Sequence, residues 1–212
     1  MNNLLTDISE NLQKGKAKIV AELVQQAVGE GIKPDDVLKS LLSGMDVIAI
    51  KFKNNEVYVP EVLIAARAMN MGTSLLKPYL GESNNSIGKV IIGTVKGDMH
   101  DIGKNLVRMM FEGKGFEVVD LGVDVSPERF LEAYNNENPD IVALSALLTT
   151  TMPEMKNTIN AFVEAGVRDD VIFMIGGAPI TDEFCKSIGA DYYTADAASA
   201  AETAKEAIAK VS

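Results

Sequence analysis

The chain has 212 residues, enough for one large or two small domains, and its apolar fraction of 47% and charged fraction of 24% are ordinary for a globular protein. Its formal net charge of −10 argues against a nucleic-acid partner, because phosphates are bound by basic surfaces. The single cysteine, Cys185, excludes an internal disulfide and any multi-cysteine zinc or iron–sulfur site. No apolar run is long enough to span a bilayer and the first residues lack a signal-peptide pattern, so we expect a cytoplasmic protein with no membrane partner.

Residues 1 to about 83 have helical periodicity and almost no strand pattern. We expect one helix over residues 19–28, a second from Pro34 with its apolar stripe at 37–42, a third over 44–52 and a longer one over 60–76. The residues expected on the apolar stripes are Ile19, Leu23, Val24, Ala27, Val28, Val37, Leu38, Leu41, Leu42, Val62, Leu63, Ala66, Met69 and Leu76. Four or five helices joined by short loops predict a small all-α bundle.

The polar, turn-forming segment 81–86 predicts a domain boundary, with the bundle at residues 1–85 and a second domain at residues 86–212. In the second domain, short apolar runs alternate with helical patterns. The expected strands are 89–95, 117–121, 141–144, 171–175 and a weaker 191–194, and the expected helices are 102–114, 127–135, 153–165, 181–188 and 197–210. Five such units predict an α/β domain with a doubly wound, five-stranded parallel sheet of the flavodoxin or Rossmann-like kind.

The only histidine of the chain lies in the segment Gly97-Asp98-Met99-His100-Asp101-Ile102-Gly103, between the first strand and the helix that follows it. A neutral imidazole is a common ligand of transition metals, and a carboxylate two residues earlier can accept its other N–H and fix its tautomer. Gly103 lets the backbone pass close to a bulky group. A lone loop histidine is more often simply solvated, but Asp98-x-His100-x-x-Gly103 at a strand-to-helix turn indicates a metal-cofactor site.

Two further loops are expected at the same edge of the sheet, because parallel strands end there together. The loop after the third strand holds the hydroxyl-rich segment 145–151, and the loop after the fourth holds Gly176 and Gly177. Hydroxyls can bind a ligand without bulk, and glycines admit a flat or elongated one. Alone, these features are explained equally well by a helix N-cap and an ordinary turn. Their convergence on one edge favours a ligand site.

Asp98-x-His100-x-x-Gly103, Ser145-x-Leu147 and Gly176-Gly177 together resemble the signature of the cobalamin-binding domains of methionine synthase and of methyltransferase corrinoid proteins. The likeness continues through segments 93–98 and 119–124, and segment 58–63 resembles the helical cap of that family. It covers nearly the whole chain, and the layout is similar to the small corrinoid proteins of methylamine- or methanol-type methyltransferase systems. The resemblance implies cobalamin, as methylcobalamin or a related corrinoid with its cobalt, as the cofactor.

The resemblance also implies a role for each matching residue. His100 would be the lower axial ligand of cobalt, Asp98 would hold its other nitrogen, and Thr151 would continue this relay where methionine synthase has serine. The rest of the motif would contact the cofactor through Gly97, Met99, Asp101, Ile102 and Gly103. The nucleotide tail would lie in a channel lined by Gly103, Ser145, Leu147, Thr149, Gly176 and Gly177, with Ala195 and Asp196 at its far end. Phe52, Val59 and Val62 of the bundle would cover the methyl-bearing face.

These roles imply a protein that accepts a methyl group on Co(I) from a substrate-specific methyltransferase and passes it from methyl-Co(III) to a second methyltransferase. The expected partners are these two enzymes, the second acting on tetrahydrofolate or coenzyme M, and a reductive activase. No zinc set for a methyl acceptor is present, so we expect a carrier that does not complete a reaction alone.

Two alternatives bind the same cofactor. A cobalamin-dependent mutase subunit shares the histidine motif but generally lacks the preceding bundle. A cobalamin-binding sensor or regulator can share both domains, but it needs an output module, and this chain has no basic helix for DNA. A flavodoxin-like domain without metal leaves the lone histidine and its partners unexplained. The sequence does not identify the methyl donor.

Overall fold

A computed structural model describes residues 2–76, 78–79 and 86–211 of the chain. The chain divides into two compact units, residues 1–85 with 113–115, and residues 86–112 with 116–212. Apart from Ser86, the expected boundary segment 81–86 lies outside the described residues. No helix in the described part of the chain is long and apolar enough to cross a membrane.

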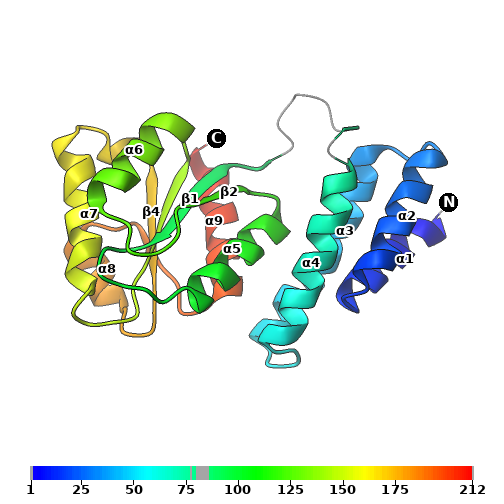
Figure 1. Ribbon diagram of the computed structural model, residues 1–212, viewed down its shortest axis with the longest axis horizontal. Helices are drawn as coiled ribbons and strands as arrows, with labels where there is room; N and C mark the ends of the chain where they lie inside the picture. The colour runs from blue at the N-terminus through cyan, green and yellow to red at the C-terminus, as the bar shows by residue number, and fades with distance from the viewer. Residues whose placement is uncertain (1, 77, 80–85, 212) are drawn as a thin grey trace. The chain divides into compact units, whose positions relative to one another are not determined.

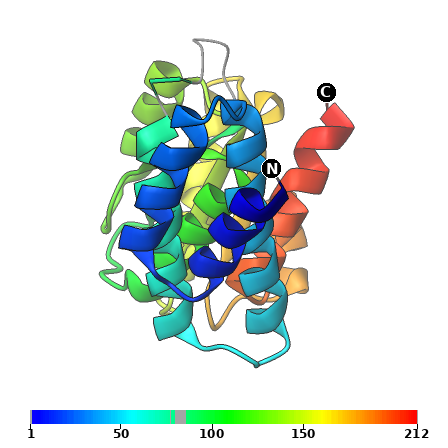
Figure 2. The same ribbon diagram turned by 90° about the vertical axis from the view of Figure 1, so that its right-hand side faces the viewer.

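The first unit is a bundle of helices, drawn in blue and cyan in Figures 1 and 2. Over its described residues it contains α1 (Asn2–Gln13), α2 (Ala17–Gly29), α3 (Pro34–Lys53) and α4 (Val59–Leu76). Apolar residues at helical spacing form its core, among them Ile8, Leu12, Val20, Val24, Ala27, Val37, Leu41, Met45, Ile48, Val62, Ala65, Met69 and Leu76. The helical bundle predicted from the sequence is confirmed.

The bundle differs from the prediction in three places. No range had been expected for α1, and α3 is one helix where two had been expected. It continues through Gly44 because this residue lies against α1, where a Cβ atom would stand 3.0 Å from Leu12 Cδ2 and from the carbonyl oxygen of Ser9. The glycine therefore allows two helices to approach closely and does not end a helix. Ile19 and Leu63 lie on the exposed flanks of their helices, with 39% and 41% of their surface exposed.

The second unit is a parallel sheet in the order β2-β1-β3-β4-β5, which confirms the predicted doubly wound arrangement. Its strands are β1 (Lys89–Thr94), β2 (Glu117–Asp120), β3 (Ile141–Ser145), β4 (Ile172–Gly176) and β5 (Tyr192–Tyr193). Its helices are α5 (Ile102–Lys114), α6 (Pro127–Glu137), α7 (Met152–Glu164), α8 (Asp182–Ile188) and α9 (Ala197–Val211), with a 3₁₀ turn at Arg168–Asp170. These bounds lie within two residues of those expected. Figure 1 shows α6, α7 and α8 on one face and α5 and α9 on the other.

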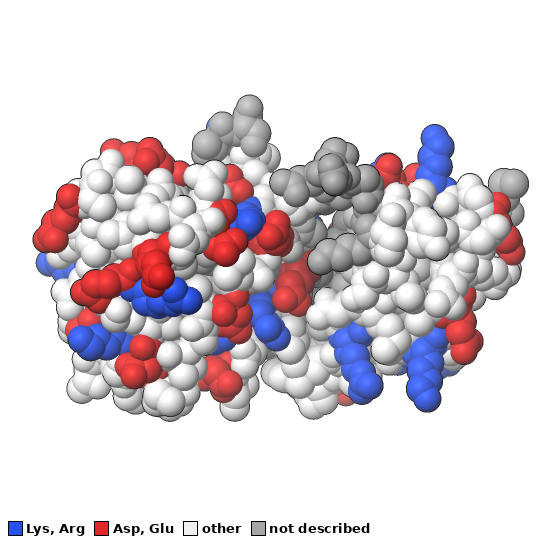
Figure 3. Space-filling view, turned by 45° about the horizontal axis from the view of Figure 1, so that its top comes forward, with Lys and Arg blue, Asp and Glu red and all other residues white. Residues whose placement is uncertain are grey.

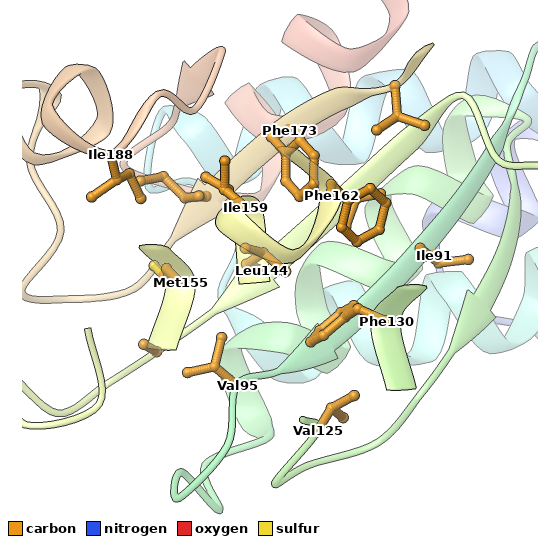
Figure 4. Packing of buried hydrophobic residues seen from close by; sticks show 14 of the residues in the cluster. Ile91, Val95, Val125, Phe130, Leu144, Met155, Ile159, Phe162, Phe173 and Ile188 are labelled. Carbon is orange, nitrogen blue, oxygen red and sulfur yellow. The ribbon is translucent and has the colours of Figure 1, made fainter. Parts of the chain in front are cut away.

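An aromatic and aliphatic core fills the face of the sheet that α6, α7 and α8 cover (Figure 4). The rings of Phe162 and Phe173 meet edge to face, with their centroids 5.0 Å apart. Phe130 packs so tightly on β1 that a Cβ atom at Gly93 would stand 2.7 Å from its ring. Because this packing fixes helices and strands together, the loops at the carboxyl ends of the strands start from a rigid base.

Candidate cofactor site

The loop between β1 and α5 turns sharply and presents His100 to solvent. Gly97 makes the turn with φ +78°, a conformation that favours glycine. Thr94, buried at the end of β1, donates its hydroxyl to the carbonyl oxygen of His100 over 2.8 Å. The side chain of His100 is 50% exposed, whereas that of Asp98 is fully buried. Of these two motif residues, Asp98 is therefore enclosed by the protein, whereas half of the His100 side chain is accessible from outside.

The buried carboxylate of Asp98 joins this loop to the loop after β3. Its Oδ1 lies 2.7 Å from Nδ1 of His100. Its Oδ2 accepts the backbone N–H of Leu147 at 2.8 Å and the hydroxyl of Thr151 at 2.7 Å, with the N–H of Leu148 at 3.3 Å. Burial raises the pKa of Asp98, but the hydrogen bonds from Thr151, Leu147 and His100 lower it far below its usual range.

Because Asp98 is ionised at neutral pH, it can only accept hydrogen bonds. The short contact with His100 therefore requires a proton on Nδ1 of the imidazole. In the neutral ring this leaves Nε2 with its lone pair free, which is the form that binds a transition metal. The pair thus sets both the tautomer and the orientation of a single imidazole ligand.

Thr151 stands at the N-terminus of α7, where an ordinary N-cap had been the alternative explanation. Its side chain makes no capping hydrogen bond, unlike Ser126 and Thr181, which cap α6 and α8. The Thr151 hydroxyl instead lies 2.7 Å from Asp98 and 2.9 Å from the carbonyl oxygen of Leu148. Its single proton can serve one of these acceptors at a time, and the hydrogen bond to the ionised carboxylate of Asp98 is the shorter and stronger one.

Large apolar side chains are exposed on the two joined loops and at the first residue of α5. Met99 and Ile102 have 67% and 77% of their surface exposed, and Leu147 and Leu148 have 42% and 41%. Among the described residues from 86 to 210, Val163 is the one other large apolar side chain exposed to this degree. Such a concentration of exposed apolar surface is typical of a ligand site. Such surface can pack against the flat, mainly apolar face of a large ring.

Two glycines at this edge leave open space that the protein itself does not fill. A Cβ atom at Gly103 would meet nothing within 4 Å, and one at Gly176 would meet only the carbonyl oxygen of Thr194 at 3.9 Å. Gly177 is different, because it has φ +140° and a Cβ there would stand 1.8 Å from the carbonyl oxygen of Ala146. Gly103 also weakens α5, by roughly 0.5–1 kcal/mol relative to alanine. Space above bare backbone is suited to an elongated group lying along it.

The other predicted tail residues differ in burial and in their contacts. Ser145 at the end of β3 is partly buried, and Thr149 and Ala195 are exposed. The carboxylate of Asp196 accepts the N–H and the hydroxyl of Ser199, each at 2.8 Å. Asp196 therefore caps α9, a structural role that the sequence analysis had not assigned to it.

The predicted lid residues belong to the bundle. Phe52 near the end of α3 and Val59 at the start of α4 are partly buried, and Val62 is fully buried. Val62 is thus a core residue of the bundle, whereas Phe52 and Val59 keep part of their apolar surface accessible.

Two residues near His100 were missed by the sequence analysis. Thr94 binds the carbonyl oxygen of His100, and Asp124, in the loop after β2, accepts the N–H of Gly97 at 2.6 Å. Segment 119–124 resembled the cobalamin-binding family, but no role for it followed from the residue types.

With His100 as the single candidate ligand in the described part of the chain, the site suits a metal whose other ligands are supplied by a cofactor. Over the described residues, no group of three or more His, Cys, Asp or Glu side chains is arranged to hold a metal ion. One oriented imidazole amid exposed apolar side chains fits a metal already bound in a macrocycle, as cobalt is in cobalamin. The residues present therefore fit this cofactor, with His100 as the side chain that would bind its metal.

Comparison with known proteins agrees with this geometry. Two family models, each described as B12 binding domain, match residues 88–204 and residues 4–77. The dimethylamine corrinoid protein of Methanosarcina barkeri is 38% identical over 209 residues, covering 97% of this chain and 98% of the relative. The trimethylamine corrinoid protein of Methanosarcina barkeri is 40% identical over 198 residues, covering 92% and 88%.

A solved structure has the same arrangement. The crystal structure of the methanol:cobalamin methyltransferase complex MtaBC from Methanosarcina barkeri contains a chain with a TM-score of 0.89 and 32% identity, covering 97% of this chain and 80% of that chain. The fold, the site and these matches define a cobalamin-binding protein, so the predicted cofactor is confirmed. The chain belongs to the corrinoid protein family.

Proposed function

We propose that this corrinoid protein carries methyl groups from a substrate-specific methyltransferase to a second methyltransferase. The general role of methyl carrier is supported by relatives named dimethylamine and trimethylamine corrinoid proteins and by the likeness to the methanol:cobalamin methyltransferase complex. The observation that carries the proposal is the 2.7 Å contact between Asp98 Oδ1 and His100 Nδ1, which prepares one imidazole as a metal ligand. The cofactor, when bound, supplies the cobalt at which the methyl group is held.

In this proposal His100 would bind the cobalt of the cofactor, and Asp98 and Thr151 would fix the orientation of its imidazole. Asp98 keeps the proton on Nδ1 and directs Nε2 outward, and Thr151 and Leu147 hold Asp98 in place.

The two units divide the remaining work. Residues 86–212 form the cobalamin-binding domain, with the tail beside Gly103, Ser145, Leu147, Thr149, Gly176, Gly177, Ala195 and Asp196. Residues 1–85 form the cap, and Phe52 and Val59 offer the accessible apolar surface for shielding the methyl group from water. Support for the cap comes from the B12 binding domain model that matches residues 4–77.

The partners follow from the carrier role. The likeness to a chain of the methanol:cobalamin methyltransferase complex MtaBC supports docking of a donor-side methyltransferase. An acceptor-side enzyme acting on tetrahydrofolate or coenzyme M and a reductive activase complete the proposed set. The donor itself is left open, because a dimethylamine and a trimethylamine protein are similar to the chain to nearly the same degree.

Charge supports protein partners over nucleic acid. Residues 86–212 contain 11 Lys and Arg against 20 Asp and Glu. Acidic side chains are spread over the face of this unit seen in Figure 3, with basic ones between them. A surface of this kind repels phosphate groups. Residence in the cytoplasm stays a prediction.

Transfer of the methyl group tests the proposed function. The full chain is loaded with methylcobalamin, freed of unbound cofactor, and mixed with coenzyme M or tetrahydrofolate and the matching acceptor-side methyltransferase. We expect one enzyme to demethylate the bound cofactor, followed as a change in visible absorption. If both enzymes demethylate free methylcobalamin but neither acts on the loaded protein, the chain is a sensor or another cobalamin binder and not a carrier.

A further inference from the structure

Asp124, in the loop between β2 and α6, has an unusual backbone conformation. Its φ of +54° lies in the left-handed region, which few residues other than glycine adopt, although Asp and Asn tolerate it best. The described chain has two other such residues, Asn55 and Asn138. A non-glycine residue held there is usually fixed by its surroundings.

The contacts of Asp124 explain what fixes it. Its Oδ1 accepts the N–H of Gly97 at 2.6 Å, and its own N–H donates to the carbonyl oxygen of Asp98 at 3.0 Å. Asp124 therefore binds the Gly97-Asp98 segment from both ends. The next residue, Val125, continues the attachment by pairing with Val95 of the same loop.

An ion pair between a buried lysine and a partly exposed aspartate supports the loop that carries Asp124. The ammonium group of Lys104, whose side chain is 2% exposed, lies 2.6 Å from both carboxylate oxygens of Asp120. Oδ1 of Asp120 also accepts the N–H of Gly122 at 2.9 Å. The carbonyl oxygen of Gly122 in turn accepts the N–H of Thr94 at 3.0 Å. The loop after β2 is thus tied to α5 and to β1, on either side of His100 in the chain.

The loop that carries His100 is consequently held from two sides. On one side the loop after β3 binds the carboxylate of Asp98 through Leu147 and Thr151. On the other side Asp124 binds the backbone on either side of the same residue. The first set of contacts fixes the side chain of Asp98, and the second fixes the peptide from which that side chain projects. A ligand needs both, because an error of about 0.5 Å in its position weakens binding.

We propose that Asp124 is a positioning residue for His100, acting through the N–H of Gly97 and the backbone of Asp98. The inference rests on the proposed ligation of cobalt by His100. Asp124 touches neither the metal nor the methyl group in this account. It keeps the turn at Gly97 closed, so that the Asp98 carboxylate meets Nδ1 and the imidazole stays aimed outward. The Lys104–Asp120 pair keeps the loop of Asp124 in register with α5.

Two substitutions separate the hydrogen bond from backbone strain. Asp124→Gly removes the acceptor and accepts φ +54° without cost, whereas Asp124→Asn keeps an oxygen for the Gly97 N–H and tolerates the same φ. Asn138→Gly is the matched control, because Asn138 has φ 46° and forms the C-cap of α6. All three variants are made in the full chain and reconstituted with cobalamin.

The readouts are the fraction of bound Co(II) whose EPR spectrum shows splitting by a histidine nitrogen, the Kd for cobalamin, and the midpoint of thermal unfolding. We expect Asp124→Gly to lower the ligated fraction and to weaken cobalamin binding by about tenfold, the lower end of the range for groups that orient a ligand. Asp124→Asn is expected to keep most of the ligated fraction and of the cobalamin affinity of the parent. Asn138→Gly is expected to leave both quantities at the parent values.

If the parent shows the histidine splitting, any one of three results would overturn the inference about Asp124 and leave the proposed ligation by His100 intact. These are a full ligated fraction in Asp124→Gly, an equal loss in Asn138→Gly, or a loss in Asp124→Asn as large as in Asp124→Gly. Absence of histidine splitting in the parent itself would instead overturn the proposed ligation, and the inference with it. A change in unfolding midpoint with no change in ligated fraction indicates a structural role only and also counts against it.

Discussion

The hydroxyl of Thr151 and the carboxylate of Asp98 lie 2.7 Å apart, although 53 residues separate them in the chain. Thr151 belongs to the loop after β3 and Asp98 to the loop after β1, and the two strands are neighbours in the sheet. Because Asp98 also contacts His100, the loop after β3 is linked to the proposed cobalt ligand through this one carboxylate. The site is therefore assembled by the sheet and cannot exist in either loop alone.

Thr151→Val tests this contact, because valine keeps the branched shape and removes the hydroxyl. We expect a several-fold weaker affinity for cobalamin, since a buried carboxylate loses one hydrogen bond. Thr151→Ser is expected to bind as the parent does. Thr158→Val is the control, because Thr158 is a buried threonine of α7 whose hydroxyl donates to the carbonyl oxygen of Glu154, one turn earlier in the same helix. Equal affinities for Thr151→Val and the parent would remove Thr151 from the network.

Gly103→Ala is expected to act in opposite directions on stability and binding. Alanine has room at position 103 and favours a helix, so the free energy of unfolding without cofactor should rise by roughly 0.5–1 kcal/mol. Affinity for cobalamin should fall, because the new methyl group occupies the space proposed for the tail. Gly176→Ala is expected to weaken binding in the same way with little effect on stability.

Gly177→Ala is the contrast to these two variants. A Cβ atom there would clash with the carbonyl oxygen of Ala146, so we expect lower stability with or without cofactor. Urea unfolding without cofactor and cobalamin titration measure both quantities for all three variants. Unchanged affinity in Gly103→Ala and Gly176→Ala would place the nucleotide tail elsewhere.

The pKa of Asp98 predicts how its stabilising effect changes with pH. Burial raises this pKa, but hydrogen bonds from Thr151, Leu147 and His100 lower it well below the usual 3.8. A carboxyl whose pKa is lowered by folding stabilises the folded chain above its unfolded-state pKa, and the effect is lost as the pH falls toward the folded value. The free energy of unfolding of the parent should therefore exceed that of Asp98→Asn at about pH 5, and this difference should shrink below about pH 4. Urea unfolding of both proteins across this range measures it, and a difference that does not change down to about pH 3 would contradict the assignment.

The lid residues are tested in the full chain. Phe52→Ala and Val59→Ala remove partly accessible apolar surface, so we expect methylcobalamin bound to these variants to photolyse with a higher net yield, as the methyl radical escapes more often. Val62→Ala is expected to act differently, because its side chain is buried in the bundle and its loss should cost about 2 kcal/mol of stability. Parent-like photolysis in Phe52→Ala and Val59→Ala would assign the bundle another role.

The sheet and the motif were predictable because local patterns encode them. Alternating apolar runs and helices determine a parallel sheet, and Asp98 and His100 are close in the chain, so their pairing follows from spacing. What the sequence could not reveal depends on long-range contacts. Gly44 has the residue type that ends helices, and only its contact with Leu12 and Ser9 shows why α3 continues. Asp124 looks like an ordinary loop residue until its contact with Gly97, 27 residues away in the chain, is seen.

The central claim is that His100 binds cobalt, and isotope labelling tests it most directly. His100 is the only histidine of the chain, so protein grown with ¹⁵N-histidine is labelled at this one imidazole. With ordinary nitrogen the Co(II) EPR spectrum of the reconstituted protein should show triplet splitting from one axial nitrogen. The account predicts that ¹⁵N-histidine converts the triplet to a doublet and that His100→Ala abolishes this doublet. A triplet that persists in the labelled protein would show that the axial nitrogen belongs to the cofactor's own base, and it would contradict the assignment of His100.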